Sequence, residues 1–260
     1  MKTLSAQLEI DISYRQRLRW VLSNLDSHDR VVLDVGCGDA FLLRRIASTQ
    51  VYRVGIDSSY QSLKASKIVS SSLGLVCASG SHLPFRSAVF DTVIMMEVLE
   101  HLLSPRVALL EASRVMSSKS KLLVTVPNLN FPSLWDPISK VIACLGAHPL
   151  RTGMLAGFWY MHHRLYDVQE LNRELQECFV TQEVLGLTHF FLPFYPYIVN
   201  IYANVVYHLT KSPFKLPWPL RAALNFLDRR NLSATNLNGA ATIFASAIPR
   251  KRGSPRVQAD

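Results

Sequence analysis

The chain has 260 residues, enough for one large α/β domain with insertions and a substantial buried core. Its formal net charge of +9 suits nucleic acid, an anionic membrane surface or an acidic ligand, so charge alone does not choose among them. The four cysteines show no CxxC or zinc-ligand spacing, and residues 1–16 lack the apolar core of a secretory signal. These features argue against a disulfide-rich secreted domain and lead us to expect a cytoplasmic protein.

The N-terminal segment, residues 1–29, is predicted to be helical. Within residues 12–25 the apolar residues Tyr14, Leu18 and Val21 recur at helical spacing. The arginines of this stretch lie largely outside the apolar stripe. We interpret them as a solvated face; an arginine that reaches a ligand carboxylate is the alternative.

The sequence VVLDVGCGDA at residues 31–40 is the motif on which the functional interpretation depends. Its apolar part predicts a strand buried on both faces, and Gly36 and Gly38 permit the positive φ of a tight turn and a close approach of backbone amides to a ligand. The following residues, AFLLRRIAS, have helical spacing. This strand, glycine turn and helix predict a small-molecule site at the amino end of the helix.

A second strand, VYRVGID, ends in Asp57, 19 residues after Gly38. In a βαβ unit, an acid at this place lies beside the glycine turn and can accept from both hydroxyls of a ribose. The structural alternative makes Asp57 a cap of the next helix, although Ser58 and Ser59 could also provide that cap.

Three more strands follow, LGLVCA, VFDTVIMM and KLLVTVPN, and the loop between the first two of these is expected to pass over the ligand. Ser104 is predicted to cap a helix that begins at Pro105. The alternation of strands and helices predicts a doubly wound, mostly parallel sheet with its ligand at the carboxyl ends of the strands.

The remaining chain divides by composition. We expect a core domain over residues 30–187, containing an irregular flap at 129–165, and then a hydrophobic insertion at 188–235. A last core strand is predicted within 236–249. Residues 250–260 are basic, lack an apolar period and are expected to be a disordered tail.

The chain resembles the class I methyltransferases that use S-adenosylmethionine (SAM). The resemblance rests on five motifs in this order and spacing: VLDVGCGDA, GID, LPF, VFDTVIMMEVLEHL and LLVTVPN. The resemblance covers residues 30–187 and 238–248 and is closest to the branch that acts on small molecules, quinones and lipids. It implies a seven-stranded Rossmann-like sheet whose last strand is antiparallel, and transfer of a methyl group to a small lipophilic acceptor, with O-methylation favoured.

The resemblance also implies roles for single residues in binding SAM. Those expected around its methionine end are Asp34, Gly36 and Gly38; those at the ribose are Asp57 and Ser58; and those around the adenine are Ser79, Gly80, Met96 and Glu97. Ser79 departs from the family, which usually has aspartate there. Because its bond to the adenine amino group lacks charge assistance, we expect it to be weaker.

Two other readings of the chain compete with this one. A nicotinamide or flavin dinucleotide protein also has GxGxx and an acid after the second strand, but Phe41 stands where that fingerprint needs Gly or Ala. A catalytically weak or inactive protein with the same fold, acting as a scaffold at a membrane surface, is the second alternative.

Methyl transfer from a sulfonium depends mainly on positioning, so few catalytic groups are needed. For a hydroxyl acceptor, the candidates for a general base are His162, His163 and His101, with the pair in the flap ranked first. The fourth strand ends in MMEVLEH, which is unlike the Asn/Asp-Pro-Pro-aromatic signature of nucleobase amine methylation. We therefore expect no nucleic-acid substrate.

Residues 184–210 contain no Asp, Glu, Lys or Arg. As one helix they would span about 40 Å, more than the roughly 30 Å hydrocarbon core of a bilayer, but two prolines interrupt the first half and a polar stripe runs along the second. That stripe consists of Asn200, Asn204 and His208. Basic and aromatic residues follow. We favour a peripheral, monotopic membrane contact through 184–230, with a lid on the core and a membrane span as alternatives.

Overall fold

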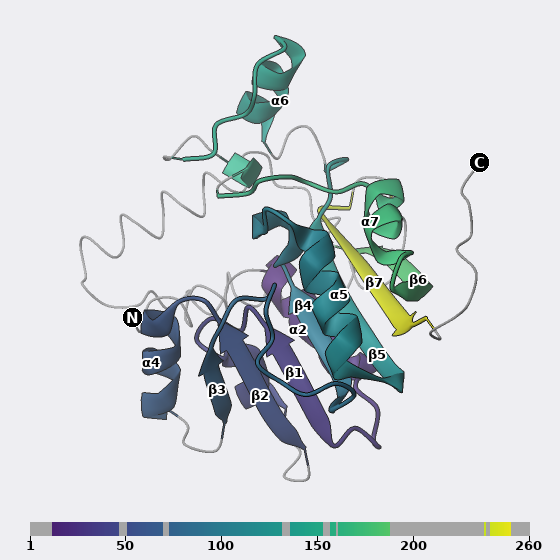
Figure 1. Ribbon diagram of the computed structural model, residues 1–260. Coiled ribbons are helices and arrows are strands. Elements are labelled where there is room, and N and C mark those ends of the chain that lie inside the picture. Colours follow the sequence, from purple (N-terminus) through teal and green to yellow (C-terminus); the bar gives the residue numbers. More distant parts are fainter. Residues whose placement is uncertain are drawn as a thin grey trace, which may run out of the picture. The chain divides into compact units, whose positions relative to one another are not determined.

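The computed structural model describes residues 12–46, 51–69, 73–131, 136–152, 157–159, 161–187, 237 and 240–250. Seven strands form one sheet in the order β3-β2-β1-β4-β5-β7-β6 (Figure 1). Their bounds are β1 Val31–Val35, β2 Tyr52–Asp57, β3 Gly74–Cys77, β4 Phe90–Met96, β5 Met116–Pro127, β6 Phe179–Leu187 and β7 Thr242–Pro249.

The first five strands of the sheet are parallel. β1 pairs with β2 and β4, β2 pairs with β3, and β4 pairs with β5, all in parallel register. The direction of β7 follows from its hydrogen bonds. Asn128, just after β5, donates its N–H to the carbonyl of Ala241, just before β7. Arg250, just after β7, likewise donates to the carbonyl of Cys178, just before β6. β7 therefore runs antiparallel to both of its neighbours.

The helices connect the strands. They are α2 Ile12–Asn24, α3 Phe41–Arg45, α4 Tyr60–Val69, α5 Pro105–Val115, α6 Pro137–Cys144 and α7 Val168–Leu175, with 3₁₀ turns η1 Leu99–His101 and η2 Gly157–Trp159. Helix α5 lies across one face of the sheet (Figure 1) and buries Ala108, Leu109 and Ala112. The core strands carry apolar residues on both faces, as a covered parallel sheet requires.

The chain divides into two compact units. Among the described residues, the first unit contains 20–126, 168–184 and 244–250, and the second contains 12–19, 127–167, 185–187, 237 and 240–243. The first holds most of the sheet, and in it Trp20 meets Phe244 edge to face, with ring centroids 5.2 Å apart. In the second, Phe131, Leu165 and Ala241 form a small core with Leu129 and Trp159.

The fold class is confirmed, and the six strands placed in the sequence analysis are all present, although β5 begins at Met116, before the predicted KLLVTVPN. Two local predictions were wrong. The flap at 129–165 is not wholly irregular, because it contains α6, whose N-cap Asp136 accepts from the N–H of Ser139. Ser104 stands at the N-cap of α5, but its side chain makes no capping hydrogen bond.

Other predictions concern parts of the chain outside the described residues. The insertion at 188–235 and residues 251–260 of the expected tail are among them. Within the described ranges, no helix has both the length and the apolar character needed to cross a membrane.

Candidate functional site

The turn after β1 is built around two glycines with positive φ, +74° at Gly36 and +52° at Gly38. The N–H groups of Gly36 and Cys37 both donate to the carbonyl of Ile56, at 2.8 and 2.9 Å, which joins this turn to β2. A Cβ on Gly36 would lie 2.6 Å from Cγ2 of Val98. Only glycine fits there, and the turn after β1 therefore lies against the residues that follow β4.

Gly38 and Asp57 form the open side of this turn. The N–H of Gly38 donates to Oδ2 of Asp57 at 2.8 Å, and the N–H of Ser59 donates to Oδ1 at 2.8 Å. A Cβ built on Gly38 meets no atom within 4 Å. Because each carboxylate oxygen has a further lone pair, Asp57 can still accept from a ligand beside Gly38.

The cap of α4 is Ser59, not Asp57. The Ser59 hydroxyl accepts from the N–H of Ser62 at 3.3 Å, while Ser58, one position earlier, is exposed. Asp57 therefore does not cap α4, and its two bonds hold the glycine turn and Ser59. Ser58 keeps only a sequence-based expectation of ligand contact.

Asp34 is buried in β1, with 3% of its surface exposed. Burial in apolar surroundings, and then the negative charge of Asp57, raises the pKa of Asp34 to about 8. The carboxyl is therefore largely protonated at neutral pH. It can donate a hydrogen bond in this state, which an ionised aspartate cannot do.

Cys37 fills the space beneath the turn. A Cβ on Gly55 would lie 2.7 Å from Sγ of Cys37, so the thiol packs directly on β2. Burial, followed by the charges of Asp34 and Asp57, raises the pKa of the Cys37 thiol well above its ordinary value. A thiol in this state is a poor nucleophile, so we interpret Cys37 as a packing residue.

Met96 and Glu97 are half-buried at the end of β4. Glu97 has a left-handed backbone, φ 56°, a conformation that costs free energy for a residue other than glycine. It is held there by Thr125 on β5, whose carbonyl accepts from the Glu97 N–H at 3.0 Å and whose hydroxyl donates to its Oε1 at 2.9 Å. No motif in the sequence indicates the contribution of Thr125.

Ser79 and Gly80 follow β3. The Ser79 hydroxyl accepts from the N–H of Ser81 at 3.2 Å, forming a local turn, and the Ser79 side chain remains exposed. A Cβ on Gly80 would lie 3.1 Å from Cγ1 of Val35, so this loop comes close to the end of β1. The first unit thus brings together the predicted cofactor residues that follow β1, β2, β3 and β4.

The loop after Ser79 is anchored by two residues that our sequence interpretation missed. On α5, Arg114 pairs with Glu111 at 2.7 Å and donates to the carbonyls of Leu83 and Phe85, each at 2.8 Å. Glu111 in turn accepts from the N–H of Leu83 at 2.8 Å. The hydrogen bond from Arg114 lowers the pKa of Glu111. The only sequence signal was an acid and an arginine three residues apart on a helix.

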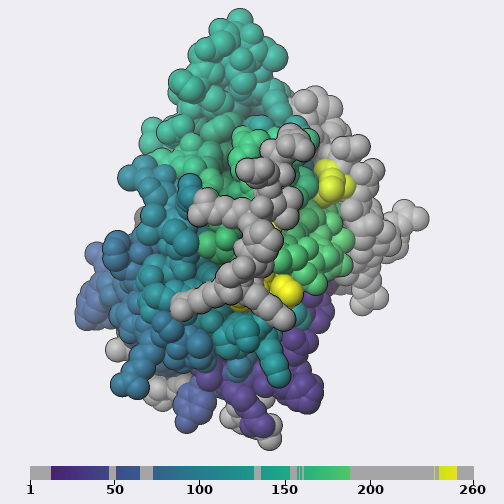
Figure 2. All heavy atoms as spheres, turned by 45° about the vertical axis from the view of Figure 1, so that its right-hand side comes forward, coloured from purple at the N-terminus to yellow at the C-terminus, as the bar shows by residue number. Residues whose placement is uncertain are grey.

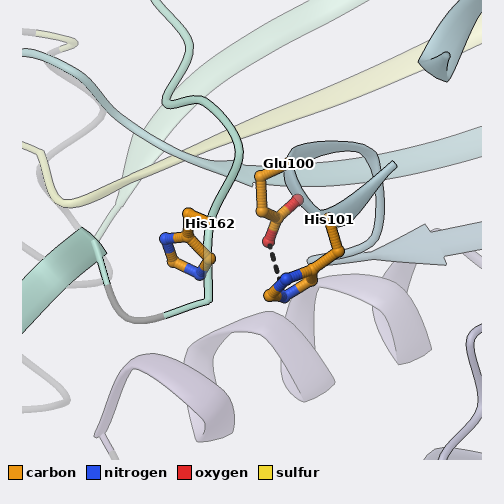
Figure 3. Close-up of side chains that lie close together, drawn as sticks. All are labelled: Glu100, His101 and His162. Carbon is orange, nitrogen blue, oxygen red and sulfur yellow. Dashed lines mark ion pairs between the residues drawn. The ribbon is translucent and has the colours of Figure 1, made fainter. Parts of the chain in front are cut away.

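Glu100 and His101 follow β4 in η1. Glu100 is fully buried, and its Oε1 lies 3.9 Å from Nε2 of His101, whose side chain is 42% exposed (Figure 3). The two side chains are thus within ion-pair distance. His101 has one nitrogen near the Glu100 carboxyl group and an imidazole that solvent or an acceptor can reach.

His162 and His163 belong to the second unit. His162 is half-buried, and its N–H donates to the carbonyl of Trp159 at 3.1 Å. His163 is exposed, and its carbonyl accepts from Arg151 at 3.2 Å. Three residues after His163, Tyr166 forms an isolated parallel β-bridge with Asn128.

Part of the chain matches a known protein family. Residues 33–124 match the family described as "Methyltransferase domain", and they include the glycine turn, Asp57 and the segment after β4. These residues form a methyltransferase domain of the class I, SAM-dependent type. The strand order and the antiparallel β7 agree with the sheet that this family resemblance implied.

Individual relatives extend the comparison. An uncharacterized protein of Methanocaldococcus jannaschii is 38% identical over 101 residues, which are 38% of this chain and 42% of that protein. The ubiquinone biosynthesis O-methyltransferase of Thiobacillus denitrificans is 27% identical over 180 residues, 66% of this chain and 74% of that enzyme. The match thus spans less than half of the first relative's length.

A solved structure of a SAM-dependent methyltransferase from Thermotoga maritima is similar to this chain, with a TM-score of 0.60. The two are 13% identical, over 93% of this chain and 91% of that one. At this identity the likeness shows the fold alone.

Proposed function

We propose that the chain binds SAM at the turn after β1 and transfers its methyl group to a hydroxyl of a small lipophilic acceptor. The observation that carries the proposal is the pairing of Gly38 with Asp57. The position beside Gly38 is open, and the neighbouring carboxylate is fixed with acceptor capacity to spare. These are the requirements for holding a ribose through its two hydroxyls.

The other residues around the turn fit the remaining parts of SAM. Asp34, Gly36 and Gly38 are proposed at the methionine end, and Ser79, Gly80, Met96 and Glu97 around the adenine. SAM supplies a methyl group on a positively charged sulfur, which is already a good leaving group. The contribution of this chain is then to fix both reactants in line and to exclude water.

A hydroxyl acceptor must lose its proton as the methyl group is transferred. The candidates are His101, His162 and His163. We favour His101 because its side chain is exposed and its Nε2 lies 3.9 Å from the buried carboxyl group of Glu100, which can orient the ring. His162 and His163 remain candidates in the second unit.

The lipophilic character of the acceptor is supported by two observations. The relative from Thiobacillus denitrificans is named a ubiquinone biosynthesis O-methyltransferase, and so are several others. Residues 184–210 lack charged side chains, which suits an apolar ligand or a lipid surface. We propose a cytoplasmic enzyme that associates peripherally with a membrane through 184–230.

Transfer of tritium from methyl-labelled SAM into an organic phase tests the proposal directly. The purified full chain is incubated with a series of lipophilic phenols and catechols, and with the same compounds blocked as methyl ethers. We expect labelled product only from compounds with a free hydroxyl. Binding of SAM without transfer to any lipid, quinone or protein fraction would instead support the scaffold reading.

A further inference from the structure

The second unit exposes a set of large apolar side chains, which we call the α6 face. It consists of Val141, Leu145, Leu150 and Met161, with exposed fractions of 58%, 79%, 44% and 62%. These four are a third of the twelve large exposed apolar residues among the described parts of the chain. The outward side of a surface helix normally carries polar residues, so such a concentration points to a partner.

The four residues fall into two pairs. Val141 and Leu145 are one helical turn apart, and the Leu145 N–H donates to the Val141 carbonyl at 3.1 Å. The helix then ends at Gly146, φ +75°, in a Schellman motif. Farther on, the N–H of Met161 donates to the carbonyl of Arg151 at 2.9 Å, which brings Met161 beside Leu150.

The opposite side of α6 is fastened to the rest of its unit. The buried carboxyl of Asp136 caps the helix and lies against Gly157, where a Cβ would come within 2.6 Å of its Cγ. Lys140 donates to the carbonyl of Leu129 at 3.2 Å and lies 4.3 Å from the Phe131 ring centroid. Burial lowers the pKa of Lys140. The orientation of the α6 face is therefore set by specific contacts.

The charges near the α6 face indicate which kind of partner it would contact. Residues 137–166 contain no Asp or Glu, and Arg151 and Arg164 stand close in sequence to Leu150 and Met161. A surface for a protein partner usually carries both signs of charge at its rim. Apolar side chains among cations, without acids, suit the boundary between anionic headgroups and acyl chains.

We propose that the α6 face inserts into the headgroup region of an anionic lipid bilayer. This contact is separate from the one expected of residues 184–230, and it does not depend on methyl transfer. It would hold the second unit at the surface in which a lipophilic acceptor dissolves. Atoms of residues 136–152 are seen as uncovered teal spheres in Figure 2.

The cysteines of the chain provide a direct test. Cys144 on α6 and Cys77 at the end of β3 are exposed, whereas Cys37 and Cys178 are buried. A polarity-sensitive fluorophore is attached to Cys144 in a Cys77→Ser chain, and to Cys77 in a matched Cys144→Ser chain. Vesicles contain phosphatidylglycerol and phosphatidylcholine in equal amounts, or phosphatidylcholine alone. We expect a blue shift only for the Cys144 label and only with anionic vesicles.

A second measurement uses unlabelled protein in vesicle sedimentation. Val141→Asp together with Leu145→Asp should lower the partition coefficient on anionic vesicles roughly 10-fold or more. Leu110→Asp, which places the same change on the exposed side of α5, should leave it unchanged. Thermal unfolding verifies that each variant folds.

Three results would overturn the proposal. One is an unshifted Cys144 label, and another is sedimentation of the double variant equal to that of the wild type. The third is a concentration-dependent dimer in light scattering that the double variant abolishes, since the α6 face would then bind a second copy of the chain. SAM binding, measured separately, tests the proposed function independently of the α6 face.

Discussion

The carboxylate of Asp57, at the end of β2, accepts a hydrogen bond from the backbone N–H of Gly38 across 2.8 Å. This bond connects the two features that the sequence places 19 residues apart. Because its other oxygen accepts from Ser59, the Asp57 side chain is held in one orientation in the absence of ligand. A ribose that binds beside Gly38 therefore meets a preorganised acceptor, and little conformational entropy is lost there on binding.

Ser79→Asp is expected to strengthen SAM binding. The Ser79 hydroxyl accepts from the N–H of Ser81, a bond that one oxygen of an aspartate can also make. The second oxygen would then be available to the adenine amino group with charge assistance, for a gain of up to roughly 10-fold in affinity. Calorimetric titration measures the effect, with Ser81→Asp as the control. Equal or weaker binding by Ser79→Asp would mean that the loop takes another path around the adenine.

Asp34 is expected to make the stability of the ligand-free protein fall as pH rises. Its pKa is about 8 in the folded chain, against an ordinary value near 3.8, so between these values the folded state binds more protons than the unfolded state. The free energy of unfolding therefore decreases from about pH 4 to about pH 8. Asp34→Asn removes this titration.

Urea unfolding of wild type and Asp34→Asn at several pH values measures the difference. The variant should gain stability relative to the wild type progressively between about pH 4 and pH 8, by on the order of a few kcal/mol at the upper end. Asp26→Asn, at an exposed site, serves as the control. Parallel stability curves for wild type and Asp34→Asn would show that the buried carboxyl does not titrate in this window.

Arg114→Ala is expected to loosen the loop that carries Leu83 and Phe85. The substitution removes the donors to both carbonyls and leaves the Glu111 carboxylate without its cation. Loss of these bonds should cost about 2–4 kcal/mol of stability and raise hydrogen exchange at the Leu83 amide. Arg114→Lys keeps the charge but not the fork, and should recover only part of the loss. Exchange at Leu83 equal to that of the wild type would contradict this role.

The three histidines are expected to differ in their effect on turnover. If His101 is the base, His101→Ala should lower turnover roughly 100-fold or more while SAM affinity stays the same. Glu100→Gln should lower turnover less, because it weakens the contact that orients the His101 ring but leaves the base in place. Single His162→Ala and His163→Ala variants test the other candidates. Wild-type turnover in all three alanine variants would remove a histidine base from the reaction.

Most of the fold was predictable from the sequence. Buried parallel strands are nearly continuous apolar runs, as at Val31–Val35 and Phe90–Met96, and each is bounded by a polar or glycine turn. The residues of the glycine turn were predictable for the same reason. Their positive φ and the collision that a side chain at Gly36 would produce are local constraints that select glycine.

Contacts between distant residues were less predictable. Thr125 supports Glu97, and Arg114 holds a loop about thirty residues earlier, through bonds that no short motif encodes. The left-handed backbone of Glu97 also had no sequence signal, because tertiary contacts rather than local preference stabilise it. Helix α6 was missed because its short apolar stretch, bounded by proline and glycine, is also typical of a loop.

The most direct test of the account is calorimetric titration of the full chain and of Asp57→Ala with SAM and with NADH. We expect the wild type to bind SAM and not NADH. The Asp57→Ala variant should bind SAM roughly 10- to 100-fold more weakly, because it loses two hydrogen bonds to a charged acceptor. Asp26→Ala, at an exposed aspartate, should bind as the wild type does. NADH binding without SAM binding, or full SAM affinity in Asp57→Ala, would contradict the assignment of this turn as the SAM site.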